Sequence, residues 1–176
     1  FPELHSILAK VTASKDFRAI TKIIYAQYKF SLKYLYKDHP QYEKIIGSNG
    51  KERRLTTSIF ELNELFTEES KRKDDLCILG LIKNNRIYRY VPNKFIEEHE
   101  NLHKYKVIIP KSNGSGALGE VLSTPLIGKP LIGYTQSFIS IGAFERHNEA
   151  EAAYKFVKTK FARALLGILK VTQDNS

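Results

Sequence analysis

The feature that most constrains the fold is a pair of apolar runs separated by a short polar turn. Leu76–Ile82 and Ile87–Val91 are rich in branched and aromatic side chains, and Lys83–Arg86 lies between them. Asparagine tolerates the positive φ angles that a tight turn requires, so Asn84 and Asn85 predict a β-hairpin at this point. The centre of the chain is therefore expected to form sheet.

Further strands are expected on the C-terminal side of this hairpin. Lys106–Ile109 is a short apolar strand that Pro110 stops, and Gln136–Gly142 alternates in part. Residues 110–133 are rich in glycine and proline, which favours loops or very short strands.

Two helices are expected on the N-terminal side. Ser14 is a suitable N-cap for a helix that runs to about Tyr36, because its apolar residues recur at three- and four-residue spacing. Pro40 limits this helix, since the residue before a proline is disfavoured in helical conformation. A second helix is expected over residues 58–69.

The strongest helical pattern lies near the C-terminal end. Asn148 and Glu151 resemble a capping box, and a long helix is expected to follow to about Lys170. Its expected buried stripe consists of Ala153, Phe156, Val157, Phe161, Ala164, Leu165 and Ile168. Helices and strands do not alternate regularly along the chain, so the order of elements predicts an α+β fold.

The charge of the chain favours a polyanionic partner. Its 176 residues carry 28 basic and 19 acidic side chains, a net charge of +9. The net charge is +6 over residues 1–60, −2 over 61–100 and +5 over 101–176. Phosphate contacts dominate nucleic-acid affinity, so two basic segments are compatible with DNA binding. A basic surface that only aids solubility is the alternative.

Other classes of site lack the necessary residues. A single cysteine, Cys77, excludes an internal disulfide framework and fits a reducing compartment. His99 and His103 would share one face of a helix, but the histidines and Cys77 have no metal-ligand spacing. The longest uncharged run, Pro130–Phe144, is too short and too polar to span a bilayer, and no basic-then-apolar segment leads us to expect export.

Two short motifs have competing interpretations. Gly114–Gly119 matches GxGxxG, but Pro125 follows too soon for the helix that a dinucleotide or S-adenosylmethionine site requires, so a turned loop is favoured. Glu69 and Lys71 fit half of a metal-dependent nuclease site. They belong to a dense charge run, for which a solvated linker is the simpler interpretation.

Several segments of the second half carry a family resemblance. They are Tyr105–Ala117, Gly119–Gly128, Thr135–Ile139, Lys158–Arg163 and Leu169–Asn175. Together they resemble the C-terminal region of adenine-specific DNA methyltransferases of bacterial restriction–modification systems, of the large single-chain type II kind that sometimes also cleaves DNA. The resemblance is strong from about residue 104 to 175, fainter over 53–91, and says little about 1–50.

The resemblance implies a target-recognition domain built of mixed sheet, a hairpin and flanking helices. It would read double-stranded DNA while a catalytic domain of the same polypeptide, with S-adenosylmethionine as cofactor, methylates adenine. The Asn-Pro-Pro-Tyr motif of that domain is absent, because prolines near a tyrosine, such as Pro40 near Tyr42, do not form it. The glycine-rich motif for the methyl donor is absent as well. We therefore expect no cofactor and no enzymatic activity in this chain alone, and a cytoplasmic, nucleoid-associated location in bacteria.

This interpretation divides the chain into a helical lead-in (1–37), a β-rich recognition core (38–147) and a spacer helix (148–172) that packs against the rest of the enzyme. The chain contains no methionine, which agrees with a piece of a longer polypeptide.

No DNA contact transfers from the family by a motif, so the candidate residues follow from side-chain chemistry. Arg suits guanine edges and Asn suits adenine, and the expected base contacts are Asn84, Arg86, Arg89 and Asn113. The expected phosphate contacts are Arg53, Arg54, Lys83, Lys111, Lys158 and Arg163. No catalytic or metal-binding residue is assigned. Two alternatives remain open: a nuclease that uses Glu69 and Lys71, and a structural domain whose basic face docks on an acidic neighbour.

Overall fold

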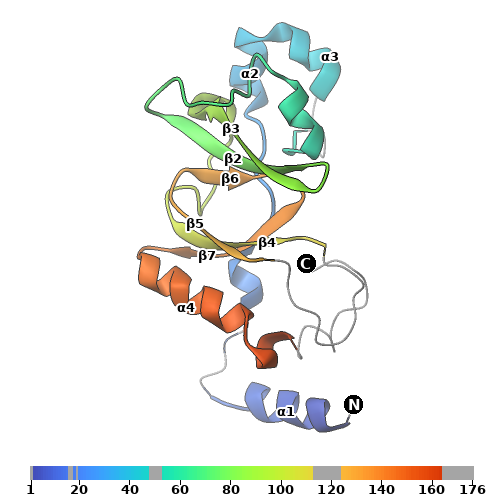
Figure 1. The fold of residues 1–176 in the computed structure, drawn as a ribbon, viewed down its shortest axis with the longest axis vertical. Coiled ribbons are helices and arrows are strands. Elements are labelled where there is room, and N and C mark those ends of the chain that lie inside the picture. Colours follow the sequence, from blue (N-terminus) through green and yellow to red (C-terminus); the bar gives the residue numbers. More distant parts are fainter. Residues whose placement is uncertain (1, 16–17, 19, 48–52, 113–123, 164–176) are drawn as a thin grey trace.

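A computed structural model describes residues 2–15, 18, 20–47, 53–112 and 124–163. Within these residues, a four-stranded and a three-stranded sheet are combined with α-helices and short 3-10 helices (Figure 1). The prediction of an α+β fold is confirmed. No helix in this described part is long and apolar enough to cross a lipid bilayer.

The three-stranded sheet contains the predicted hairpin. Its strands are β2 (Asp75–Ile82), β3 (Asn85–Pro92) and β6 (Ile132–Tyr134), in the order β3-β2-β6. β3 pairs antiparallel and β6 parallel with β2.

The hairpin turn consists of two residues with positive φ, Lys83 at 48° and Asn84 at 64°. Positive φ at both central residues is the property of a type I′ turn, which matches the twist of the strands it joins. The hairpin is confirmed, but its turn begins one residue earlier than Asn84–Asn85 because Ile82 pairs with Asn85.

The four-stranded sheet is antiparallel and has the order β1-β7-β4-β5. Its strands are β1 (Ile24–Tyr25), β4 (Tyr105–Pro110), β5 (Leu126–Gly128) and β7 (Phe138–Phe144). The central strands β4 and β7 are buried on both faces, so their sequences are nearly continuous apolar runs. This explains why β7 lacks a strict two-residue alternation.

Helix α4 (His147–Val157) covers one face of the four-stranded sheet (Figure 1). Val157 packs with Val107 and Ile109 of β4 and with Ile139 and Ile141 of β7. Ala153 and Tyr154 are partly buried against the same cluster. The buried face of α4 therefore lies at three- and four-residue spacing, as in other amphipathic helices.

Three details of this helix correct the sequence prediction. The helix begins at His147, and its N-terminus is held by Glu149, whose carboxylate accepts from the backbone amide of Arg146 at 3.2 Å, and not by the expected pair of Asn148 and Glu151. Phe156 and Phe161, expected in the buried stripe, are 45% and 37% exposed, and Phe156 lies about 100° around the helix from Val157. The helix ends at Val157, and a turn precedes the next helical residues at 160–163, so an uninterrupted helix is wrong here. Residues 164–176 lie outside the described part.

The predicted helix over residues 14–36 is also wrong. Ile24 and Tyr25 form β1 and pair with Ile141 and Ser140 of β7, so sheet pairing replaces the helical pattern at this point. The elements in this region are α1 (Pro2–Thr12), the 3-10 helix η1 (Ile20–Ile23), β1 and α2 (Leu32–Asp38). Helix α2 does end just before Pro40, as expected.

Short helical pieces complete the fold. The helix predicted over 58–69 is limited to a 3-10 helix, η3 (Thr57–Glu61). The other short helical elements are η2 (Pro40–Tyr42), α3 (Glu43–Ile46) and η4 (Asn93–Phe95).

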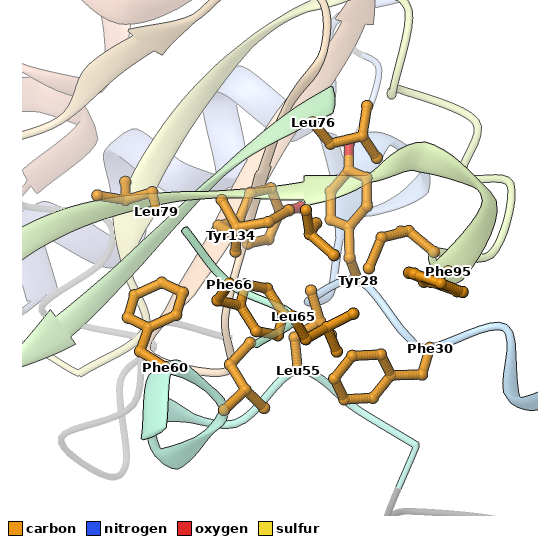
Figure 2. Packing of buried hydrophobic residues seen from close by; sticks show 14 of the residues in the cluster. Tyr28, Phe30, Leu55, Phe60, Leu65, Phe66, Leu76, Leu79, Phe95 and Tyr134 are labelled. Atoms are coloured by element: carbon orange, nitrogen blue, oxygen red, sulfur yellow. The ribbon is translucent and has the colours of Figure 1, made fainter. Parts of the chain in front are cut away.

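The main core packs aromatic side chains from the N-terminal half against the three-stranded sheet (Figure 2). The Phe66 ring lies edge-on to Phe60 at 5.6 Å and to Phe30 at 6.1 Å between ring centroids. A Cβ atom added at Gly80 of β2 would lie 2.5 Å from Cε2 of Phe60. The Phe60 ring therefore rests directly on the backbone of the hairpin and fixes η3 against it.

Candidate nucleic-acid interface

The tip of the β2–β3 hairpin presents polar side chains to solvent. Lys83, Asn84 and Asn85 are all exposed. The two-residue type I′ turn is the shortest connection that the pairing of β2 and β3 allows, so these side chains stand at the outer end of the ribbon. The tip thus carries one cation and two amides, groups that can contact phosphates and base edges.

The hairpin tip lies beside the end of β4. The Arg86 guanidinium is 5.8 Å from the centroid of the Phe138 ring and donates a hydrogen bond to the backbone oxygen of Thr124. Phe138 pairs in register with Pro110, the residue before Lys111. We call Lys83, Asn84, Arg86 and Lys111 the hairpin-tip surface, because these contacts bring the hairpin tip close to the end of β4.

Arg89, also expected to contact bases, lies elsewhere. It is three residues from Arg86, and side chains at odd spacing along a strand point to opposite faces. Its guanidinium donates to Oε1 of Glu68 at 2.9 Å and to the backbone oxygen of Tyr88 at 3.0 Å. Arg89 borders a groove of about 540 Å³, which we call the Arg89 groove and which is lined by Thr57, Ser58, Phe60, Glu61, Asn63, Leu81, Ile82 and Arg89.

Arg53 and Arg54 belong to a third location. Their segment pairs with residues 28–30, since the amide of Phe30 donates to the backbone oxygen of Arg53 at 2.6 Å and Arg54 bridges to Lys29. The Arg53 guanidinium donates to Oε1 of Glu97 at 2.8 Å, and both side chains are half-buried. Arg53 thus holds two loops together through an internal ion pair.

Lys158 and Arg163 lie beyond the end of α4. Nζ of Lys158 donates to the hydroxyl of Tyr154 at 3.2 Å and lies 4.8 Å from the centroid of its ring. Helix α4 covers the face of the four-stranded sheet that is turned away from the hairpin (Figure 1). The structure does not join these two cations to the hairpin-tip surface.

The remaining predicted motifs fall outside these surfaces. Asn113 and the glycine motif 114–119 lie outside the described residues. Glu69 and Lys71 belong to the turn before β2, where the amides of Lys71 and Arg72 donate to Oδ2 of Asp75 at 2.8 and 2.9 Å. Among the described residues, no three His, Cys, Asp or Glu side chains are grouped so that they could hold a metal ion.

A buried polar cluster, which sequence analysis did not single out, joins the two sheets. The Tyr28 hydroxyl donates to Oδ1 of Asn101 at 2.7 Å, and Nδ2 of Asn101 donates to the Ser140 hydroxyl at 2.8 Å. The Ser140 and Tyr134 hydroxyls are 2.7 Å apart. Nζ of Lys106 completes the cluster, with donor bonds to the backbone oxygen of Asn101 at 2.6 Å and to the Tyr28 hydroxyl at 3.3 Å.

Burial determines the protonation of this cluster. Lys106 is completely buried, and desolvation lowers the pKa of its amine to about 7. Desolvation also raises the pKa of Tyr134 to about 12 and raises that of Tyr28 further. A lysine within an apolar strand run was the only sequence signal for this cluster, since its partners come from distant segments.

His99 shows the same effect of burial at the edge of the cluster. Its ring stacks on Tyr28 with 4.3 Å between centroids, and desolvation lowers its pKa. His99 and His103 lie in turns and irregular structure, so the shared helical face considered for them is absent.

Comparison with protein-family models, with curated proteins and with solved structures finds no match to this chain.

Proposed function

We propose that this chain recognises double-stranded DNA and that the hairpin-tip surface makes the sequence-reading contacts. The observation that carries this proposal is that the Arg86 guanidinium lies over the ring of Phe138, which pairs in register with Pro110 at the end of β4. Lys111 follows Pro110 directly. Two segments that were expected to contact bases or phosphates thereby lie close to each other.

The chemistry of this surface supports the proposal. A two-stranded β-ribbon fits the major groove of B-form DNA, where each base pair presents a distinct set of donors and acceptors. Arg86 can donate to a guanine edge, Asn84 can pair with adenine, and Lys83 and Lys111 can neutralise phosphates. The net charge of +9 favours association with a polyanion.

In this proposal the chain contributes target recognition to a larger enzyme. An adenine-specific methyltransferase domain elsewhere in the same polypeptide would bind S-adenosylmethionine and carry out methyl transfer. Restriction activity would likewise belong to the parent protein, in a bacterial cytoplasm. The chain itself has a binding role.

The test is binding of the full chain to a labelled random-sequence duplex, followed by fluorescence anisotropy across a salt titration. We expect affinity to fall steeply with salt, because each neutralised phosphate releases counterions. Lys83→Asn removes a charge but suits the left-handed backbone, and it should reduce the salt slope by about one. Arg86→Ala should weaken binding about tenfold.

Lys155→Ala is the matched control. It removes the same charge from the exposed face of α4, on the other side of the four-stranded sheet, and should change affinity less than about twofold. Equal effects of Arg86→Ala and Lys155→Ala would reject the hairpin-tip surface. Absence of binding even at low salt would reject DNA recognition and favour docking of the basic face on an acidic neighbouring domain.

A further inference from the structure

The Arg89 groove lies between η3 and the hairpin, on the face of β3 opposite Arg86. Its volume of about 540 Å³ is within the range of small-molecule sites. Phe60 and the side chain of Ile82, which is 39% exposed, provide an apolar wall. Hydroxyls of η3 and the amide of Asn63 provide a polar rim.

Arg89 is the cation of this groove, and its partner is exchangeable. Packing leaves only 23% of the Arg89 side chain exposed, whereas Glu68, which accepts its hydrogen bond at 2.9 Å, is 82% exposed. An ion pair with such an exposed carboxylate contributes little to stability. The Glu68 carboxylate therefore occupies a position that a phosphate or carboxylate from outside can take.

The remaining lining residues favour one kind of ligand. A flat aromatic ring can cover the apolar wall, because the side chains of Phe60 and Ile82 offer no hydrogen bonds to it. Asn63 can pair with the edge of a base, and the Glu61 carboxylate can accept from an exocyclic amino group. A ligand that joins an anion to an aminated ring satisfies both halves of the groove.

We propose that the Arg89 groove binds a nucleotide, with its phosphate on Arg89 in place of the Glu68 carboxylate and its base against Phe60 and Ile82. This site is separate from the hairpin-tip surface and does not rest on duplex recognition. The nucleotide can be free or can be an unpaired unit of a DNA strand.

The test is a titration of the full chain with deoxyadenosine monophosphate, followed by amide chemical shifts in NMR. Saturable shifts are expected at Leu81, Ile82 and Arg89. Deoxyadenosine without phosphate and inorganic phosphate without a base should each bind at least about tenfold more weakly, because each satisfies half of the groove.

Three variants distinguish this site from general electrostatic attraction. Arg89→Ala should weaken nucleotide binding about tenfold, since a charge-assisted hydrogen bond is lost. Glu68→Gln should strengthen it roughly two- to fivefold by releasing Arg89. Glu69→Gln is the matched control: it removes the same charge one residue away and should leave affinity within about twofold.

The outcomes separate this inference from DNA recognition by the hairpin. Nucleotide binding without duplex binding supports the groove and rejects the hairpin-tip proposal, and the reverse result rejects the groove. Equal effects of Glu68→Gln and Glu69→Gln also overturn the inference. A short single strand that binds through Arg89 more tightly than the mononucleotide identifies a strand as the source, and equal affinity identifies the free nucleotide.

Discussion

Nζ of Lys106 lies 2.6 Å from the backbone oxygen of Asn101, and both residues are completely buried. Around this bond, hydroxyls of Tyr28, Ser140 and Tyr134 join the two sheets. The Lys106 amine donates to two neutral oxygens, the Asn101 carbonyl and the Tyr28 hydroxyl. Burial without an anionic partner favours the neutral amine and lowers its pKa to about 7.

This pKa predicts that stability increases with pH above neutrality. Between the folded pKa of about 7 and the usual value of 10.5, the unfolded chain binds one more proton than the folded chain. The free energy of unfolding should therefore rise by up to about 1.4 kcal/mol per pH unit from this group. Above the usual tyrosine pKa of 10.0, the raised pKa values of Tyr28 and Tyr134 act in the opposite direction.

Urea unfolding between about pH 7.5 and about pH 9.5 measures this slope. Lys106→Met removes the titrating amine at similar volume and should abolish most of the slope. A slope that persists in Lys106→Met would assign it to another group.

The left-handed turn makes Asn84 a position where glycine is preferred. Its φ of 64° costs a residue with a Cβ about 1–2 kcal/mol in general and asparagine less. We expect Asn84→Gly to raise the free energy of unfolding by up to about 1 kcal/mol and Asn84→Val to lower it by at least as much. Urea midpoints compare the two variants, and equal stability would contradict a type I′ turn at Lys83–Asn84.

A larger residue at Gly80 is expected to lower the free energy of unfolding. In Gly80→Ala the added Cβ would lie 2.5 Å from Cε2 and 2.9 Å from Cζ of Phe60, a ring that is itself buried. Overpacking of this kind should cost about 1–3 kcal/mol by thermal or urea unfolding.

Gly128→Ala is the comparison, because its nearest neighbour is the terminal methyl of Ile108, which can rotate away. It should cost less than Gly80→Ala. The cost of Gly80→Ala should also diminish in a Phe60→Leu background, and strict additivity of the two changes would show that the ring does not oppose the methyl group.

Variants of two adjacent residues can test which face of α4 is buried. Val157→Ala removes buried methyl groups from the contact with β4 and β7 and should cost about 1–3 kcal/mol. Phe156→Ala removes a larger but 45% exposed side chain and should cost less. A larger cost for Phe156→Ala than for Val157→Ala in urea unfolding would contradict the burial of Val157 and the partial exposure of Phe156.

Sequence patterns predicted the elements whose partners are close along the chain. The hairpin was predictable because β2 and β3 are adjacent and the turn carries asparagines. The start of α4 was misplaced, because a capping box is recognised by a polar acceptor at the N-cap, whereas here Arg146 precedes the helix and only Glu149 accepts from its backbone amide.

The candidate site was predictable only in part. Lys83, Asn84 and Arg86 were found because cations and amides at a turn are a local signal. Arg86 and Arg89 point to opposite faces of β3, and this follows from strand geometry once the strand is known. The groove beside Arg89 was not predictable, since η3 reaches it through the packing of Phe60 on Gly80.

The sequence by itself determined the α+β class, the β2–β3 hairpin and the basic character of the chain, because local periodicity, turn chemistry and charge do not depend on distant contacts. Tertiary structure decided that Ile24 and Tyr25 form a strand and that Lys106 is buried. The physical reason is the same in both cases. Pairing with β7 and enclosure between the sheets come from segments far apart in sequence, and their contacts outweigh local propensity.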